Sequence, residues 1–456
     1  VQSAAAASGA SRIEVPKDFS SNAEAEAAQI TQQLAALAED EKQSVNALAH
    51  LANDNLAFLR DCGDYWEITK KRLDAMASGV PTEEVLIWDF WTPKSSIPKI
   101  KEIIAEYTDS TEFAGIQPNE GEEPPTLLKN APGAACCEPL TIMFGTPTYG
   151  KLDPTAKMAP FFYLFLGMCF GDAGYGLLVG GVLAFFLARH SLTPTLRKFF
   201  SLMLIGMVCT VIFGALTGSW FGDAIFAFPF LEGAKNILGG FQILDPMKNP
   251  MTLLAISLAL GFVQVLFGLA LAFYENWRSG DKFAAVADQG GWIIFLIGLV
   301  ATGLSLGGVL SSVCVLPSEI CAVAGAAILV LTQGREKKNI LLRVFSGIMS
   351  LYNVTGFLGD VLSYSRLLAL GLGSAAVGMV INLLCKLVSG TPYVGIVCAV
   401  LIFVIGHVFS IAVNLLGAFI HSLRLQYVEF FGKFYTATGH DFTPLTNAAR
   451  YSKIIG

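Results

Sequence analysis

Long apolar runs dominate the chain after residue 160. The first run, 160–188, is interrupted at 171–176 by Gly-Asp-Ala-Gly-Tyr-Gly, which predicts a tight turn between two short helices. A helix needs about 20 apolar residues to cross a bilayer. The pattern therefore predicts an α-helical polytopic membrane protein with about eight spans, the later ones at 199–222, 250–275, 288–309, 318–333, 351–388 and 394–435.

The last two runs, 351–388 and 394–435, are too long for ordinary spans. At ~1.5 Å per residue, continuous helices of this length would extend about 57 and 63 Å, whereas the hydrocarbon core is ~30 Å thick. An ordinary tilt of ~20° does not absorb this excess. The two helices must be steeply tilted, bent or projecting beyond the membrane, and we expect tilt, because tilted helices could wrap a curved neighbouring surface.

The first 150 residues are more polar and predict a separate domain. Apolar residues recur at near-heptad spacing over 23–76, which is typical of one arm of a coiled coil. Residues 85–91 and 112–116 resemble strands, with a helix between them. We expect residues 1–150 to form a cytoplasmic coiled-coil arm with a small α/β lobe, and residues 151–456 to form the transmembrane domain.

Composition and charge support this division. The chain is 54% hydrophobic and only 14% charged, which is too few charges to cover a soluble protein of 456 residues. If the turn at 171–176 lies outside, the outside loops hold little positive charge beyond Lys235 and Lys248, and both termini are cytoplasmic by the positive-inside rule. The net charge of −6 gives no indication of nucleic-acid binding. The inside loops then hold Arg189, Arg197, Lys198, Arg278, Lys282, Arg335, Lys337, Lys338 and Arg343.

Each of the last two runs carries an arginine inside its predicted span. Arg366 and Arg424 each end a stripe of polar and small residues that recur at steps of three and four, which places them on one helix face. A charged side chain near the membrane centre costs at least ~2.5–3.5 kcal/mol, so it should line water or meet a partner. The stripes are Asn353, Gly356, Asp360 and Ser363 in the first run, and His407, Ser410, Asn414, Gly417 and His421 in the second.

These residues also have structural interpretations. Arg366 could form an internal ion pair with Asp360, and Arg424 could mark the cytoplasmic end of its span. There is no Gly-rich phosphate loop and no metal-ligand spacing of cysteines, so we expect no cofactor on this chain. The residues that could be satisfied packing groups are His407, Asn414 and His421.

Specific motifs accompany the arginines. The clearest are Phe-Gly-Asp-Ala-Gly-Tyr-Gly at 170–176, Ser-Tyr-Ser-Arg-Leu-Leu-Ala-Leu at 363–370 and His-Ser-Leu-Arg-Leu-Gln-Tyr-Val-Glu-Phe at 421–430. Together they resemble the membrane subunit of V-type and archaeal or bacterial A-type rotary ATPases, called subunit a or subunit I. In that family two α/β lobes lie on a coiled coil. Because only one lobe and one arm can be identified here, we expect the N-terminal domain to be incomplete.

The resemblance implies that Arg366 and Arg424 face a rotor ring of small membrane subunits. A guanidinium 4 Å from a ring carboxylate is worth ~4 kcal/mol at an effective dielectric constant of 20, so Arg366 would release the bound H⁺ or Na⁺ and block direct leakage between two half-channels. Other implied partners are peripheral-stalk subunits, the central-stalk cap subunit and, indirectly, the soluble ATPase head. Eukaryotic relatives have a glutamate where Asn414 stands. The residues expected along the ion path are Asp360, Ser363, Asn414, His421, Gln426 and Glu429.

Two other functions fit parts of the pattern. A secondary transporter could use Arg366 and Arg424 to hold an anionic substrate, although such folds usually contain inverted repeats, and none is evident here. A structural scaffold would explain the N-terminal arm but not the arginines within the membrane.

Overall fold

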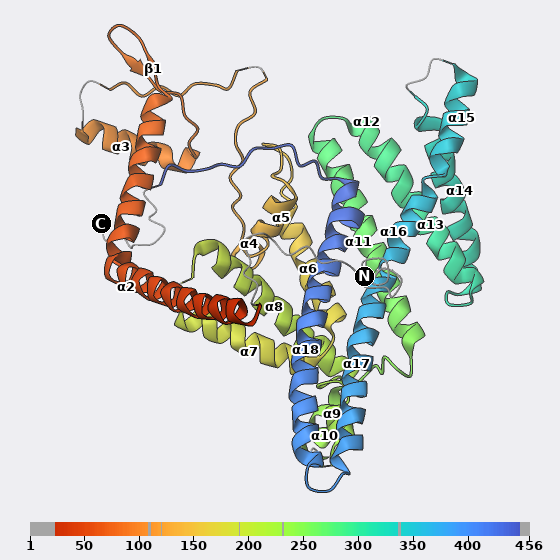
Figure 1. Ribbon diagram of the computed structural model, residues 1–456. Helices are drawn as coiled ribbons and strands as arrows, with labels where there is room; N and C mark the ends of the chain where they lie inside the picture. Colours follow the sequence, from red (N-terminus) through yellow and green to blue (C-terminus); the bar gives the residue numbers. More distant parts are fainter. Residues whose placement is uncertain are drawn as a thin grey trace, which may run out of the picture. The chain divides into compact units, whose positions relative to one another are not determined.

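The computed structural model describes residues 23–107, 111–119, 121–190, 192–229, 232–335 and 339–446 (Figure 1). Contacts divide the chain into two units, which are described separately. One unit comprises Val1–Thr92 with Thr443–Gly456, and the other comprises Pro93–Phe442.

The first unit is built on one long helix, α2 (Ala23–Ala77), as the near-heptad pattern predicted. Strands β1 (Val80–Pro81) and β2 (Leu86–Ile87) follow as a short antiparallel hairpin, so the strand predicted at 85–91 is confined to two residues. The apolar residues of α2 are exposed, including Leu48 and Leu51. Pairing of α2 with a second coiled-coil arm therefore stays a prediction.

The second unit begins with η1 (Lys94–Ser96) and α3 (Ile97–Tyr107), which confirms the helix predicted in this region. The strand predicted at 112–116 is wrong, because its described residues form irregular chain. A strand needs a neighbour to satisfy its backbone groups, and none of the described segments pairs with it. The short helices α4 (Pro132–Ala135) and α5 (Glu138–Phe144) then lead to the membrane helices.

Eight helical segments account for the predicted spans. Two are the shorter apolar helices α6 (Thr155–Phe170) and α7 (Ala173–Arg189), which confirm the predicted hairpin. Among the described residues, six further segments are long and apolar enough to cross a membrane, so the fold is that of a helical polytopic membrane protein. These six are Pro194–Thr217 (α8), Pro250–Arg278 (α11), Lys282–Leu306, Val315–Thr332 (α14), Phe345–Ser389 and Gly395–Lys433.

Several of these segments contain more than one element. Lys282–Leu306 comprises α12 (Lys282–Ala284), the π-helix η4 (Ala285–Gly290) and α13 (Gly291–Leu306). The remaining short elements are α9 (Ala224–Ala227), α10 (Glu232–Leu238), η3 (Gly239–Phe241) and η5 (Ser312–Cys314).

The first of the two long segments is interrupted. It consists of α15 (Ile340–Leu351), α16 (Val354–Ser363) and α17 (Ser365–Ser389), with breaks at 352–353 and at Tyr364. That tilt, bending or projection beyond the membrane absorbs the excess length stays a prediction. The second segment continues from α18 (Gly395–Arg424) into the π-helix η6 (Leu425–Phe430) and η7 (Phe431–Lys433).

The core of this unit lies around α6. Its side chains Phe162, Phe165, Leu166 and Phe170 are fully buried, and the helix packs on α8, α17 and α18 (Figure 1). Helices α17 and α18 also pack against each other along the bundle. The long segments that carry the arginines therefore rest on a rigid apolar helix.

The turn between α6 and α7 is held by a buried carboxylate. Gly171 ends α6 with φ +54°, and Asp172 follows it with only 1% of its surface exposed. The Asp172 carboxylate accepts hydrogen bonds from backbone amides of Tyr175, Phe221 and Gly222 at 3.0, 3.0 and 2.7 Å, and from the Ser219 hydroxyl at 2.8 Å. This one side chain therefore fastens the loop after α8 to the start of α7.

Replacing Asp172 by alanine should destabilise the protein by at least ~3 kcal/mol, because it leaves several buried donors without an acceptor. Thermal unfolding of the solubilised protein measures this loss. Asp172→Asn keeps one acceptor oxygen and should cost less, and Glu319→Ala, at an exposed acidic residue of α14, is the control. An unchanged unfolding temperature for Asp172→Ala would contradict the role of this carboxylate.

Candidate functional site

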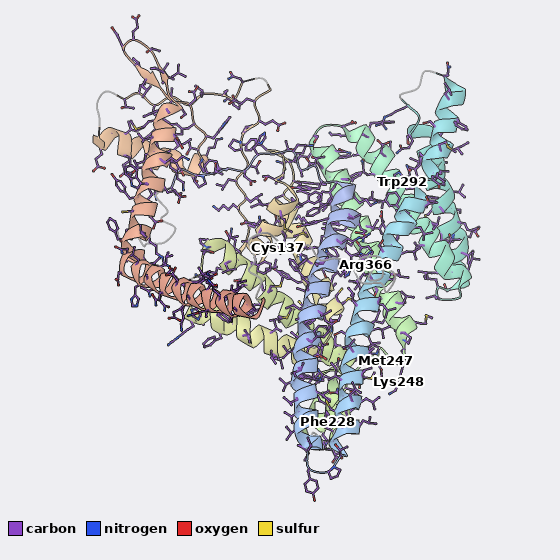
Figure 2. The ribbon with its side chains drawn as sticks, viewed as in Figure 1. Cys137, Phe228, Met247, Lys248, Trp292 and Arg366 are labelled. Carbon is purple, nitrogen blue, oxygen red and sulfur yellow. The ribbon has the colours of Figure 1, made fainter. Side chains whose placement is uncertain are left out.

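Arg366 lies in the first turn of α17, just after the break in the helix. Figure 2 shows it about midway along the bundle formed by α16, α17 and α18. Its side chain is half-buried, forms no ion pair among the described residues, and its buried Nη1 has no hydrogen-bond partner there. Among the described residues Arg366 is therefore a cation that no acid pairs directly, although Glu429 is close enough to act on it electrostatically.

Asp360, the acid nearest to Arg366 in the sequence, is engaged elsewhere. Its carboxylate forms an ion pair with the Lys433 ammonium group, and both side chains are largely buried. The same ammonium group lies 4.3 Å from the centre of the Phe357 ring, a cation–π contact. Asp360 is thus paired with the lysine at the end of the last helical segment rather than with Arg366.

The break that positions Arg366 is anchored by a buried tyrosine. The Tyr364 ring is fully buried against α11, where Gly261 makes room for it: a Cβ at Gly261 would lie 2.3 Å from the ring. The Tyr364 hydroxyl donates to Gln264 Oε1 at 2.7 Å, and Gln264 Nε2 donates to Gln426 Oε1 at 2.6 Å. This chain of hydrogen bonds connects α17, α11 and η6.

The π-helix η6 turns two polar residues inward. Gln426 and Glu429 are 0% and 2% exposed, whereas Arg424, just before the π-helix, is exposed. Wide helical turns of this kind are rare and occur often at functional sites. Arg424, just before this turn, is thus exposed, whereas the amide of Gln426 and the carboxylate of Glu429 within it are buried.

Five of the buried polar atoms without a partner belong to one set of residues around Arg366. Most buried polar atoms in proteins are hydrogen-bonded, so this concentration indicates a place for water or an ion. Arg366 is close enough to act electrostatically on both His421 and Glu429, and Ser363 lies beside the Glu429 carboxylate. The five atoms are Arg366 Nη1, His421 Nδ1, Ser422 Oγ, Gln426 Nε2 and Glu429 Oε2. We call Asp360, Ser363, Arg366, His421, Gln426 and Glu429 the Arg366 cluster.

The polar stripe on α18 changes its surroundings along the helix. His407 and Ser410 are buried, Asn414 and His421 are half-buried, and Arg424 is exposed. The stripe thus starts inside its own chain and ends on the surface, where the last arginine is available to another molecule. Arg424 lies close enough to His421 for its positive charge to act on the imidazole.

The first half of the stripe belongs to a second set of linked polar residues, the His407 network. His407 Nδ1 is 2.7 Å from the Tyr175 hydroxyl, and Nε2 is 3.2 Å from Asn382 Oδ1. Asn382 Nδ2 donates to Asp223 Oδ1 at 2.8 Å. On the other side of Tyr175, its hydroxyl is 3.3 Å from Ser410 Oγ, which accepts from Asn414 Nδ2 at 2.9 Å.

Sequence patterns did not reveal four residues that belong to, or are bonded to, these two sets. Gln264 and Asn382 are lone polar residues inside apolar runs, and that isolation was the available signal. Tyr175 stands in the glycine-rich turn motif and Asp223 in a loop, so only the fold brings them to His407. Among the described residues, no group of three or more His, Cys, Asp or Glu side chains is placed to bind a metal ion.

Just beyond the last helical segment, the chain is fastened to the segment before α6. The Tyr435 hydroxyl donates to the carbonyl of Gly145 at 2.5 Å, and the Tyr427 hydroxyl donates to the carbonyl of Leu140 at 2.6 Å. Burial raises the pKa of Tyr435 above its ordinary value, and the negative charges of nearby carboxylates add to the effect, so this phenol stays protonated.

Comparison with known proteins connects this site to one family. Residues 343–447 match the model of the V-type ATPase 116kDa subunit family. The A-type ATP synthase subunits I of Thermococcus kodakarensis and Methanocaldococcus jannaschii are each 34% identical to this chain, over 80% and 84% of its length. The V-type ATP synthase subunit I of Borreliella burgdorferi is 28% identical over 75% of it. The alignments cover 54%, 58% and 56% of these relatives, so the chain spans little more than half of their length.

The Asp360–Lys433 pair can be tested by a double-mutant cycle. Asp360→Asn and Lys433→Gln should each destabilise the protein by about 1 kcal/mol or more, because each leaves a largely buried charge unpaired. The double variant should lose less than the sum, with a coupling of about 1 kcal/mol. Thermal unfolding of the four proteins measures the coupling, and strictly additive losses would show that the pair is not formed.

Proposed function

Because the chain belongs to the family of A-type and V-type ATP synthase subunit I, we propose that it is the membrane stator subunit of a rotary ATPase or ATP synthase. In this role it does not hydrolyse or make ATP itself. It transfers H⁺ or Na⁺ to and from a rotor ring while a soluble head performs the ATP chemistry.

The observation that carries the proposal is the unpaired guanidinium of Arg366. Among the described residues no acid forms an ion pair with it: Asp360 is occupied by Lys433, and the buried Glu429, which acts on Arg366 electrostatically, lies beyond ion-pair distance. A carboxylate arriving on a moving ring would gain ~4 kcal/mol at 4 Å in an effective dielectric constant of 20, enough to displace its bound ion. Lysine is a poorer choice, because its ammonium group loses its proton more readily when desolvated.

The Arg366 cluster supplies polar groups for one half-channel. Asp360 and Ser363 precede Arg366 on the α16–α17 segment, and His421, Gln426 and Glu429 approach from the last segment. Their unpartnered atoms are suited to hold the transferred ion or its water. Asn414, seven residues from His421 on α18, belongs to the path on the other side of the arginine, and exposed Arg424 is a second cation for the ring.

The remaining surface of the long helices fits a ring of small membrane subunits. Val377, Leu384, Leu401 and Val408 are exposed along α17 and α18, and such apolar side chains suit lipid or a neighbouring helix. In the proposed orientation, both termini lie in the cytoplasm of a prokaryotic cell. The N-terminal helix would contact peripheral-stalk subunits, and the central-stalk cap subunit would lie beneath the ring.

Arg366→Ala tests the proposal in vesicles that contain the complete complex. ATP-driven ion uptake should fall to background, because nothing else would displace the ion from the ring carboxylate. Arg366→Lys should retain only a small part of the rate. The measurement is the initial rate of uptake together with the rate of ATP hydrolysis.

Arg189→Ala is the matched control, since Arg189 is an exposed arginine at the end of α7. It should leave uptake unchanged. Full coupling in an assembled Arg366→Ala complex would refute the proposed function.

A further inference from the structure

The His407 network has a defined direction. Asn382 Nδ2 faces two acceptors at 2.8 Å, the backbone carbonyl of Phe221 and the carboxylate of Asp223, so its amide orientation is fixed. Asn382 Oδ1 therefore faces His407 Nε2, which must carry a proton to donate. A neutral His407 then has a bare Nδ1, and only the Tyr175 hydroxyl is there to donate to it.

The other half of the network continues from Tyr175 to α18. The single hydroxyl proton of Tyr175 has two acceptors within reach, His407 Nδ1 at 2.7 Å and Ser410 Oγ at 3.3 Å, and it can serve only one of them at a time. Ser410 also accepts from the Asn414 amide. The contacts form an unbroken chain from Asn414 to Asp223, and its three central groups, Ser410, Tyr175 and His407, carry protons that can be exchanged.

The position of the network complements that of the Arg366 cluster. Asn382 lies sixteen residues after Arg366 on the continuous helix α17, about 24 Å along the axis at ~1.5 Å per residue. Asp360 lies on the other side of the break. Asp223 directly precedes α9 and Phe228 directly follows it. Helix α9 packs on α17, and the label of Phe228 in Figure 2 shows that this contact lies toward the far end of α17. In the proposed orientation, this end faces the outside.

The surroundings of His407 suit a proton better than a metal cation. The imidazole is 3% exposed and its ring lies among those of Phe221, Phe403 and Tyr175. Hard cations need several oxygen ligands, and of these three rings only Tyr175 offers an oxygen. The carboxylates of Asp172 and Asp223 act electrostatically on His407, and their negative charge offsets part of the cost of a transient imidazolium.

We propose that Ser410, Tyr175 and His407 form a proton relay that serves as the outer half-channel, so that the transported ion is H⁺; this rests on the proposed function. A proton arriving from the rotor ring binds the Ser410 oxygen as the serine hydroxyl turns and gives its proton to Tyr175, and the tyrosine proton passes to His407 Nδ1. The imidazolium then turns away from Tyr175, gives this Nδ1 proton to the Asp223 carboxylate and turns back with its Nε2 proton in place. Asp223 releases the proton to the outside, so one proton enters, one leaves, and His407 keeps its starting tautomer.

The relay is tested on the complete complex in liposomes, as ATP-driven proton uptake. His407→Gln, which keeps hydrogen bonding but has no exchangeable ring proton, should lower the initial rate at least tenfold. Tyr175→Phe, which removes only a hydroxyl, should lower it several-fold. Both complexes should assemble with unchanged subunit composition and keep their rate of ATP hydrolysis when the membrane is made permeable to protons, which a merely structural role would not predict. His190→Gln, at an exposed histidine after α7, is the matched control and should retain the full rate.

The outcomes separate this inference from the proposed function. If Arg366→Ala abolishes uptake but an assembled His407→Gln complex keeps the full rate, the relay is refuted and the stator role stands. If His407→Gln does not assemble, Tyr175→Phe decides, and a full rate overturns the relay. ATP-driven uptake of radioactive Na⁺ by the unmodified complex in the presence of a protonophore would also overturn it.

Discussion

A positive charge held among apolar helices without a partner of its own is the constraint on which this structure depends. A charged side chain within a bilayer costs at least ~2.5–3.5 kcal/mol, and proteins usually offset that cost with an internal acid. Here the nearby acid Asp360 is neutralised by Lys433, which also lies against an aromatic ring. The Arg366 guanidinium therefore keeps its capacity to meet a charge from another molecule.

The rest of the unit holds that charge in position. Arg366 follows the helix break at Tyr364, whose buried ring fits over a glycine of α11 and whose hydroxyl begins the connection through Gln264 to Gln426. Since α17 also rests on α6, movement of the arginine would require apolar side chains of several helices to repack. Rigidity matters because a Coulomb interaction in a medium of low dielectric constant changes steeply with distance.

Those features that depend on local pattern were predictable from the sequence. Apolar runs of 20 residues or more gave the spans, and the glycines around Asp172 gave the hairpin, because each signal lies within a few neighbouring residues. The two arginines were found for the same reason, as charges inside apolar runs. The strand at 112–116 was wrong because a strand depends on a partner that may lie anywhere in the chain, and periodicity does not report it.

The arrangement of the site depended on tertiary structure. The regular steps of three and four predicted that His407 and Arg424 lie on one face of the helix. They did not predict that His407 is buried and Arg424 is exposed. The π-helix after Arg424 and the break at Tyr364 each change the direction of later side chains, and neither follows from hydrophobic spacing. Gln264 and Asn382 became meaningful only when their partners were known. Gln264 bonds to Tyr364 and Gln426, 100 and 162 residues away, and Asn382 bonds to Phe221, 161 residues away.

The separation of the two polar sets follows from how α17 packs between them. Gly371 lies against the carbonyl of Met168, and a Cβ at Gly378 would lie 2.6 Å from the backbone of Gly222. Ser374, between these glycines, is 2% exposed and donates to the carbonyl of Phe170. This stretch is thus packed closely on its own chain at these three positions, and no hydrogen bond among the described residues joins the Arg366 cluster to the His407 network. Under the proposed function, an ion that passes from one set to the other would leave this chain and be carried past Arg366 by the rotor ring, which is the condition under which ion flow can be coupled to rotation.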